Sequence, residues 1–302
     1  MAFTAQDVKD LRERTGVGMM DCKKALTEAD GDMTKAAEIL RERGLAAANK
    51  KAGRIASEGM VVAIADADAK LGAVVEVNSE TDFVAKNESF QNFVKELADI
   101  VMRKKPADVD ALMKLPMGNT TVEEELREKI LVIGENLKIR RFERFEGVAS
   151  AYIHGGGTHG VLVQFDAAAD LAAKPEFMLF GKDIAMHIAA ENPTYLDRGE
   201  VPAEVLEKEK EILMAQAINE GKPANIAEKM VMGRVNKFYE LNCLLQQKFV
   251  KDNDITVAQY VQKTGKELGG SIAVTGFVRY EKGEGLEKRS EDFAAEVAGM
   301  VK

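Results

Sequence analysis

Two short stretches of the chain contain residues whose types and spacing could do chemistry, and the first is glycine-rich. Residues 155–160 fit the G-x-G-x-x-G pattern of dinucleotide-binding loops, and His154 before them completes the His-Gly-Gly-Gly sequence of an esterase oxyanion loop. A dinucleotide loop must lead into a helix, but residues 161–165 are typical of a strand. The esterase needs a G-x-S-x-G nucleophile, which the sequence lacks. We therefore expect the glycines to form a hairpin turn.

The second stretch is Asn-Ser-Glu-Thr-Asp-Phe-Val-Ala-Lys, at residues 78–86. Its structural interpretation is that Thr81 or Asp82 caps a helix while Phe83 packs locally. Eighty-eight residues further on, where this region repeats, the chain has Ala169, Asp170, Leu171 and Ala172, so only the acidic residue is repeated. The repeated fold thus does not demand Phe83, which allows a functional role instead. The residues alone leave both interpretations open.

Nothing else in the chain favours an enzyme or a cofactor. The sequence has no G-x-x-x-x-G-K-[ST] phosphate loop and no H-E-x-x-H zinc motif. Three histidines and two cysteines are too few for a His-rich metal centre or a disulfide framework. We expect Cys22 and Cys243 to be buried thiols and His187 to be structural. No cofactor, metal or catalytic residue is predicted.

Composition limits the class of protein. The chain has 302 residues, 46% of them hydrophobic, which is enough for several domains with buried cores. Its net charge of −8 argues against a broad nucleic-acid surface, so no direct nucleic-acid contact is expected. The N-terminus has no signal-peptide core, and no apolar run could span a membrane. We predict a soluble, cytoplasmic protein without a membrane partner.

Helical patterns and an internal repeat divide the chain. Residues 1–55 predict three short helices, with Thr4 and Asp7 as a capping box, Asp32 as a later cap and Gly44 as the last stop, followed by a basic linker. Strand pairs at 60–65 with 72–78 and at 148–153 with 160–166 repeat at an offset of 88, each followed by a helix. Strands at 139–145 and 274–280 close the two units.

The second unit carries an insertion. Two apolar stripes broken by Gly-Lys-Pro at residues 221–223 predict an antiparallel helical hairpin, and residues 291–300 predict a last amphipathic helix. The predicted class is α+β, with duplicated antiparallel sheets. The expected division is a helical domain and linker at 1–55, a first core repeat at 56–145, a second at 146–199 and 250–282, the hairpin at 200–249 and a C-terminal module at 283–302.

Long stretches of this sequence resemble the family of bacterial elongation factor Ts. The two most specific read Thr-Gly-Val-Gly-Met-Met-Asp-Cys-Lys-Lys-Ala-Leu, at 15–26, and Glu-Val-Asn-Ser-Glu-Thr-Asp-Phe-Val-Ala-Lys, at 76–86. Shorter matches follow in order at 133–136, 154–155, 184–187, 227–231 and 292–298. The resemblance implies a ubiquitin-associated-like helical domain, a two-part core, a coiled-coil hairpin and a C-terminal helix.

The resemblance also implies a function. Family members exchange guanine nucleotides on elongation factor Tu, in its GDP-bound and nucleotide-free forms, and perform no bond chemistry of their own. It implies that Thr81, Asp82, Phe83 and Val84 disturb the helix that supports the Mg²⁺ site of that GTPase. Further contacts are implied for Arg12, Met19, Met20, Lys23, Ile133, Gly134 and His154.

Alternatives remain open at this point. The chain could be an interaction scaffold that alters no nucleotide affinity, or, on the glycine run and His154, a hydrolase. Met19 and Met20 could be core residues, although adjacent residues cannot both be central on one helix face. A homodimer or a dimer of heterodimers is also left open.

Overall fold

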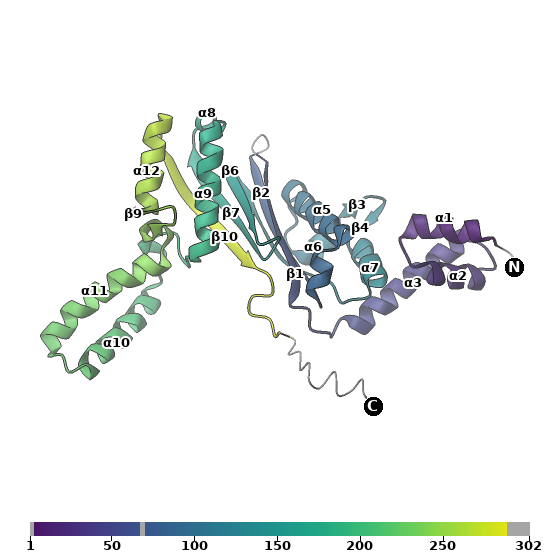
Figure 1. Ribbon diagram of the computed structural model, residues 1–302, viewed down its shortest axis with the longest axis horizontal. Helices are drawn as coiled ribbons and strands as arrows, with labels where there is room; N and C mark the ends of the chain where they lie inside the picture. The colour runs from purple at the N-terminus through teal and green to yellow at the C-terminus, as the bar shows by residue number, and fades with distance from the viewer. Residues whose placement is uncertain (1–2, 67–69, 289–302) are drawn as a thin grey trace.

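The molecule is elongated, with its sheets in the middle. The computed structural model describes residues 3–66 and 70–288. Figure 1 shows helices α1 to α3 at one end, two sheets flanked by helices in the centre and a helical hairpin at the other end. These helices and antiparallel sheets confirm the predicted α+β class. Within the described residues, no helix combines the length and apolarity that crossing a bilayer requires.

The N-terminal helical unit comprises α1 (Ala5–Thr15), α2 (Met19–Glu28) and α3 (Met33–Lys51). The predicted capping box is present, because the Asp7 N–H donates to the Thr4 hydroxyl and the Thr4 N–H donates to the Asp7 carboxylate. Side chains from all three helices fill a small core that includes Leu11, Leu26 and Leu40.

The prediction that Gly44 ends the third helix is wrong. Helix α3 continues through Gly44 to Lys51, and Gly44 is buried. A Cβ atom at Gly44 would lie 3.5 Å from the carbonyl oxygen of Arg127 in α7 (Val122–Ile133). That separation is an ordinary van der Waals distance, so Gly44 lies in the contact between α3 and α7, and Leu131 of α7 extends the small N-terminal core.

The first layer is an antiparallel sheet in the order β1 (Glu58–Asp66), β2 (Leu71–Ser79), β5 (Lys138–Glu146). Helix α5 (Glu88–Lys104) covers one face and buries Phe90, Phe93 and Leu97 there. The smaller elements of this layer are α4 (Asp82–Ala85), α6 (Val109–Met113), β3 (Pro116–Met117) and β4 (Thr120–Thr121), followed by α7.

The second layer has the same plan. Its antiparallel sheet has the order β10 (Ile272–Glu281), β7 (His159–Ala167), β6 (Val148–His154), and α9 (Pro175–Glu191) covers it. The glycine run forms the turn between β6 and β7, as predicted. The remaining elements are α8 (Ala169–Ala172), η1 (Arg198–Glu200), η2 (Leu244–Gln246), β8 (Lys248–Phe249), β9 (Asp252–Thr256) and α12 (Val257–Leu268).

The predicted repeat is present in the structure and extends further than the strands. Helices α7 and α12 each begin with a threonine capping box, at Thr121 and Thr256, and each has 12 residues. Each also ends on a left-handed glycine, Gly134 with φ 85° and Gly269 with φ 83°. Helix α12 is therefore the counterpart of α7, and strands β8–β9 occupy the place of β3–β4.

The two sheets pack face to face between α5 and α9 (Figure 1). Val61 and Val74 of the first sheet and Leu162 of the second form the centre of this contact. A Cβ atom on Gly160 would lie 2.4 Å from Val61 Cγ1, and one on Gly72 would lie 2.6 Å from Leu162 Cδ1. Glycine at both positions thus sets how closely the sheets approach.

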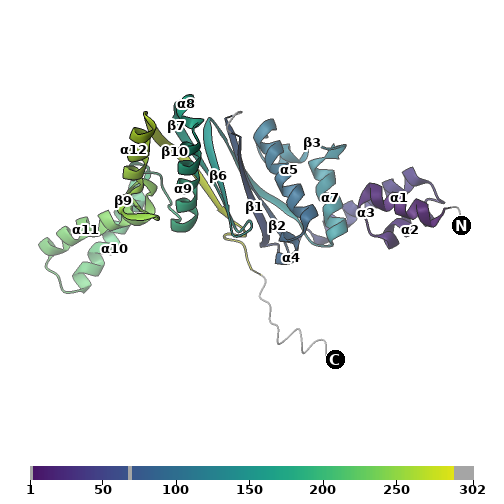
Figure 2. The same ribbon diagram turned by 45° about the horizontal axis from the view of Figure 1, so that its top comes forward.

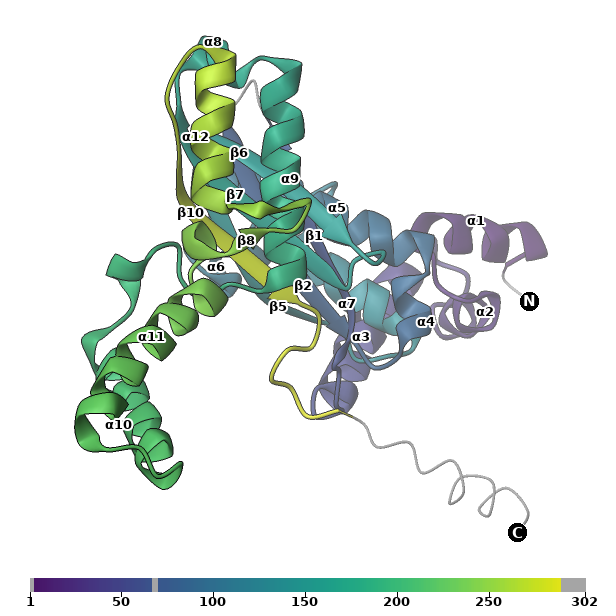
Figure 3. The same cartoon turned by 60° about the vertical axis from the view of Figure 1, so that its left-hand side comes forward.

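The insertion is a pair of antiparallel helices, α10 (Ala203–Asn219) and α11 (Ala224–Asn242), which project from the sheets (Figure 3). Leu213, Val231 and Val235 give the pair its own small core. Leu244 and Phe249 pack in the second layer instead, so the hairpin is shorter than the expected range 200–249. The helix predicted at 291–300 lies outside the described residues.

Replacing residues 202–241 with a short Gly/Ser bridge should leave a cooperatively folded core. The base of the hairpin remains joined without these residues, because the N–H groups of Thr194 and Tyr195 donate to the Asn242 carbonyl oxygen. Leu244→Ala in the full chain, a contrasting change inside the second core, should cost about 2–5 kcal/mol of unfolding free energy. Denaturant unfolding measures both, and loss of cooperative unfolding in the deletion variant would contradict this prediction.

Both cysteines are buried and free, and His187 is buried, as predicted. The His187 Nδ1 accepts the Val250 N–H at 3.2 Å, and its Nε2 lies 3.0 Å from Gln247 Oε1. This pairing suits the neutral ring with its proton on Nε2. Burial lowers the pKa of His187 below its ordinary 6.5.

The free energy of unfolding should therefore fall as the pH drops from 7 toward 5. Below pH 6.5 the unfolded chain binds a proton on His187 that the folded chain does not, so stability is complete above that pH and declines below it. His187→Gln retains an amide donor toward Gln247 and cannot titrate. Chemical denaturation at several pH values should show a smaller decline for this variant, and equal declines would contradict the assignment.

Candidate functional site

The turn after β2 presents one aromatic side chain to solvent. Phe83 in α4 is 75% exposed, whereas its neighbour Val84 is 5% exposed and packs in the first core. Figures 2 and 3 show α4 beyond the end of β2, on the side that faces the N-terminal helical unit. The structure thus excludes the interpretation of Phe83 as a locally packed residue. Val84 anchors this turn in the first core, and its contact with a partner stays a prediction.

Charged groups surround Phe83. Lys86 Nζ lies 2.9 Å from an Asp82 carboxylate oxygen and 5.4 Å from the centre of the Phe83 ring. The hydrogen bond from Lys86 lowers the pKa of Asp82, which keeps this exposed carboxylate ionised. The turn therefore offers an apolar ring beside a negative charge, an arrangement for binding a surface rather than for bond chemistry.

The second layer provides an internal comparison. Helix α8 occupies the place of α4, and Leu171 is buried there as Val84 is in the first layer. Aligning these two buried residues places the exposed Asp170 opposite Phe83, which corrects by one residue the sequence alignment that had placed Leu171 there. The shared fold therefore does not require an aromatic residue at position 83.

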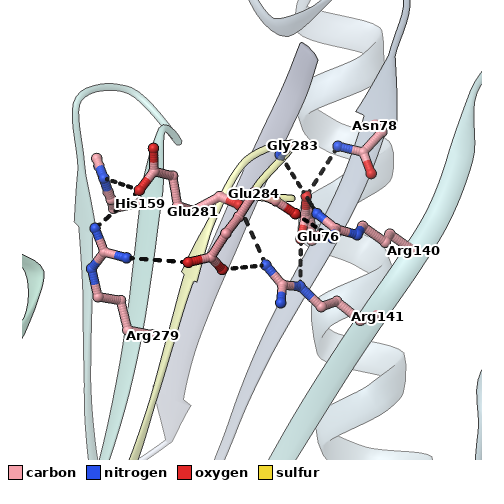
Figure 4. Close-up of polar contacts among 9 residues, drawn as sticks. All are labelled: Glu76, Asn78, Arg140, Arg141, His159, Arg279, Glu281, Gly283 and Glu284. Carbon is pink, nitrogen blue, oxygen red and sulfur yellow. Dashed lines mark hydrogen bonds and ion pairs between the residues drawn. The ribbon is translucent and has the colours of Figure 1, made fainter. Parts of the chain in front are cut away.

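A buried carboxylate fixes the strand that leads into this turn. Glu76 in β2 is fully buried, and its oxygens accept hydrogen bonds from Arg140 at 2.9 Å and Arg141 at 2.6 Å (Figure 4). The Asn78 side chain and the Gly283 N–H complete the set, at 3.0 and 2.8 Å. Strand β2, strand β5 and the segment after β10 are thereby joined.

Sequence reasoning missed Glu76, although a signal was available. The residue interrupts a run of buried valines in β2, and two consecutive arginines stand in the strand that pairs with it. A charge within an apolar strand predicts a buried pair.

The predicted contacts in the N-terminal helical unit are exposed. Met19 is 49% and Met20 64% exposed at the start of α2, which excludes a core role for either. Arg12 on α1 and Lys23 on α2 are also exposed. All four side chains are available to a partner.

Two further predicted residues lie beside the Phe83 turn. Gly134 is the exposed left-handed residue that ends α7, and Ile133 before it is half-buried against the first core. The next residue, Glu135, accepts hydrogen bonds from the N–H groups of Glu80 and Thr81 at 3.1 and 3.0 Å. The loop after α7 and the turn after β2 therefore form one structural unit.

His154 lies at the same end of the sheets but in the second layer. Its ring Nδ1 is 3.1 Å from the Tyr152 hydroxyl and its ring centre is 6.0 Å from that of His159. The glycine turn that follows accepts the Val61 N–H on the Gly157 oxygen at 2.8 Å. These contacts tie the turn to β1 and supply no serine or cysteine nucleophile for a hydrolase. Among the described residues, no group of His, Cys, Asp or Glu could hold a metal ion.

Comparison with known proteins covers the whole chain. Residues 80–284 match the family described as Elongation factor TS. The chain is 53% identical to Elongation factor Ts of Trichlorobacter lovleyi, over 100% of this chain and 99% of the relative. It is 52% identical to the proteins of that name from Nitratiruptor sp., over 100% of both chains, and from Clostridium perfringens, over 99% of both. This chain belongs to the elongation factor Ts family.

Proposed function

We propose that the protein promotes GDP release from elongation factor Tu during translation elongation. The observation that carries the proposal is Phe83, an aromatic side chain 75% exposed on a turn whose flanking residues are held in place. Exposing a phenylalanine ring to water costs free energy that the fold does not require, since the second layer forms the same turn without it.

The proposed mechanism is displacement of an ion in the GTPase. Mg²⁺ joins the nucleotide phosphates to the GTPase and offsets their charge. Asp82 and Phe83 enter beside the helix that supports the Mg²⁺ site and move it, which weakens GDP binding without breaking a covalent bond. By linkage, GDP weakens the binding of this protein to the same degree. We propose that it binds both the GDP-bound and the nucleotide-free GTPase, since it must meet the first in order to produce the second.

Other predicted residues form a second contact. Arg12, Met19, Met20 and Lys23 meet another helix of the GTPase, and the flexible methionines suit such a surface. Ile133, Gly134 and His154 contribute at the edge of the Phe83 turn. The N-terminal unit is proposed to be ubiquitin-associated-like, the hairpin a coiled coil, and the site of action the cytoplasm. A mass measurement in solution, of the protein alone and mixed with elongation factor Tu, distinguishes a homodimer from a dimer of heterodimers.

Phe83→Ala should slow stimulated GDP release at least about tenfold, equivalent to 1.4 kcal/mol. The unfolding free energy of the Phe83→Ala variant should differ from that of the unmodified protein by no more than about 0.5 kcal/mol, because the side chain is exposed. Fluorescent-GDP release measures the first quantity and denaturant unfolding the second. Leu179→Ala, at a residue 61% exposed on α9, is the matched control and should leave release unchanged.

Magnesium removal tests the mechanism separately. With Mg²⁺ chelated, the Phe83→Ala defect should shrink, since the ion that the ring displaces is already gone. A defect of undiminished size would contradict ion displacement while leaving the exchange function intact. Failure of the unmodified protein to accelerate GDP release would instead support the scaffold hypothesis.

Met19→Ala combined with Met20→Ala should weaken binding to elongation factor Tu without unfolding the N-terminal unit. Both side chains are largely exposed, so their truncation removes partner contact and little core. Calorimetric titration gives the affinity and thermal unfolding the stability. Met232→Ala, at a residue 67% exposed on the hairpin, is the control. Unchanged affinity would remove these methionines from the interface.

A further inference from the structure

Two carboxylates cross-link the Phe83 turn to the loop after α7. Glu135 uses both oxygens: Oε2 accepts the N–H groups of Glu80 and Thr81 at 3.1 and 3.0 Å, and Oε1 accepts the Thr81 hydroxyl at 2.6 Å. In the opposite direction, Glu80 Oε1 accepts the Asn136 N–H at 2.6 Å. Each loop thus supplies the carboxylate that binds the backbone of the other.

The linker before β1 joins the same network. Arg54 Nη1 lies 3.3 Å from Glu80 Oε1, and the Arg54 carbonyl oxygen accepts a hydrogen bond from the buried Asn136 side chain at 2.8 Å. The Glu80 side chain is only 11% exposed. Charge-assisted hydrogen bonds at such shielded sites are about twice as strong as neutral ones.

The Phe83 helix depends on this support because it is very short. Helix α4 has 4 residues, and a single turn is unstable alone. Its N-cap residue Thr81 makes no side-chain capping bond to α4, and its hydroxyl donates to Glu135. Val84 in the core and Thr81 on Glu135 therefore fix the turn on either side of Phe83.

The repeat shows that the fold does not need the hydrogen bonds between Glu135 and the turn that carries Phe83. In the second layer the N-cap of α8 is Ala168, which has no hydroxyl, and the residue after the left-handed glycine of α12 is Gly270, which has no carboxylate. That layer forms the equivalent strand, turn and helix without either group. The Glu135–Thr81 hydrogen bonds are therefore specific to the layer that carries the exposed aromatic ring.

We propose that Glu135 is a positioning residue for Phe83. Its carboxylate holds the turn in the orientation that presents the ring, and it couples that turn to Ile133 and Gly134, so that both enter the partner as one rigid surface. This inference rests on the proposed exchange function and assigns to Glu135 no contact with the partner of its own.

A double-mutant cycle tests the inference. Glu135→Ala should slow stimulated GDP release about tenfold, as loss of a positioning contact can do. In the Phe83→Ala background the same change should cost less than about twofold, because the group being positioned is absent. Glu135→Gln retains one acceptor oxygen, so its rate of stimulated GDP release should lie between the rates of the unmodified protein and of Glu135→Ala. Glu96→Ala, an exposed carboxylate on α5, is the matched control and should behave as the unmodified protein.

Hydrogen exchange supplies a readout that a general loss of stability would not produce. In Glu135→Ala the amides of Glu80 and Thr81 should exchange faster, while those of the central β2 strand stay protected. If Glu135→Ala fails to fold, Thr81→Ala is the second variant, because it removes only the 2.6 Å hydrogen bond from the Thr81 hydroxyl. It should slow stimulated GDP release less than Glu135→Ala would, and this effect should also shrink in the Phe83→Ala background.

The outcomes separate this inference from the proposed function. Normal GDP release by Glu135→Ala would overturn the positioning role. The same follows if Glu135→Ala slows release by the same factor with and without Phe83→Ala. In both cases the Phe83→Ala defect still supports the exchange function. A Phe83→Ala variant with normal release would overturn the proposed wedge itself, whatever the amide exchange of Glu80 and Thr81 shows.

Discussion

The buried carboxylate of Glu76 is the constraint that organises the centre of this molecule. An ionised group without water is costly unless opposite charges and hydrogen bonds surround it. Arg140, Arg141 and the Gly283 N–H meet that requirement only when strand β5 and the segment after β10 are both in place (Figure 4). The first layer is thus complete only when the end of the second layer reaches it, and strand β2, which leads to Phe83, is fixed as a result.

Duplication makes the differences between the layers informative. Both layers have two hairpin strands, a covering helix and a capped 12-residue helix leading to the third strand. They differ at the short helix, where one carries Phe83 and the other Asp170, and after the covering helix, where α6 in one corresponds to the long hairpin in the other. Packing explains the strands and helices that the two layers share. A specialised role is expected for the features that differ, the short helix and the hairpin.

Local patterns predicted much of this structure. Alternating strands, capping boxes and the repeat offset predicted the sheets and their covering helices, and the repeat showed that the fold does not require Phe83. The end of the third helix was placed too early, at Gly44, because α3 continues along its contact with α7, which lies far along the chain. The hairpin range ran too far because Leu244 has the same apolar character whether it packs on α11 or in the second core. Glu135 was missed for a related reason, since its partners Glu80 and Thr81 come from another segment and no local spacing encodes the contact.

The segment after β10, residues 282–284, has a consequence for synthesis of the chain. Lys282 pairs with Glu58 and the Gly283 N–H with Glu76, across sequence separations of 224 and 207 residues. At about 5–20 residues per second, a ribosome needs on the order of 10–40 s to add the residues between Glu76 and Gly283. During that interval the nascent first layer carries a carboxylate whose final partner has not yet been made. The native layer therefore closes only after Gly283 has been synthesised, and a truncated product that lacks residues 282–284 leaves Glu76 without its Gly283 N–H donor.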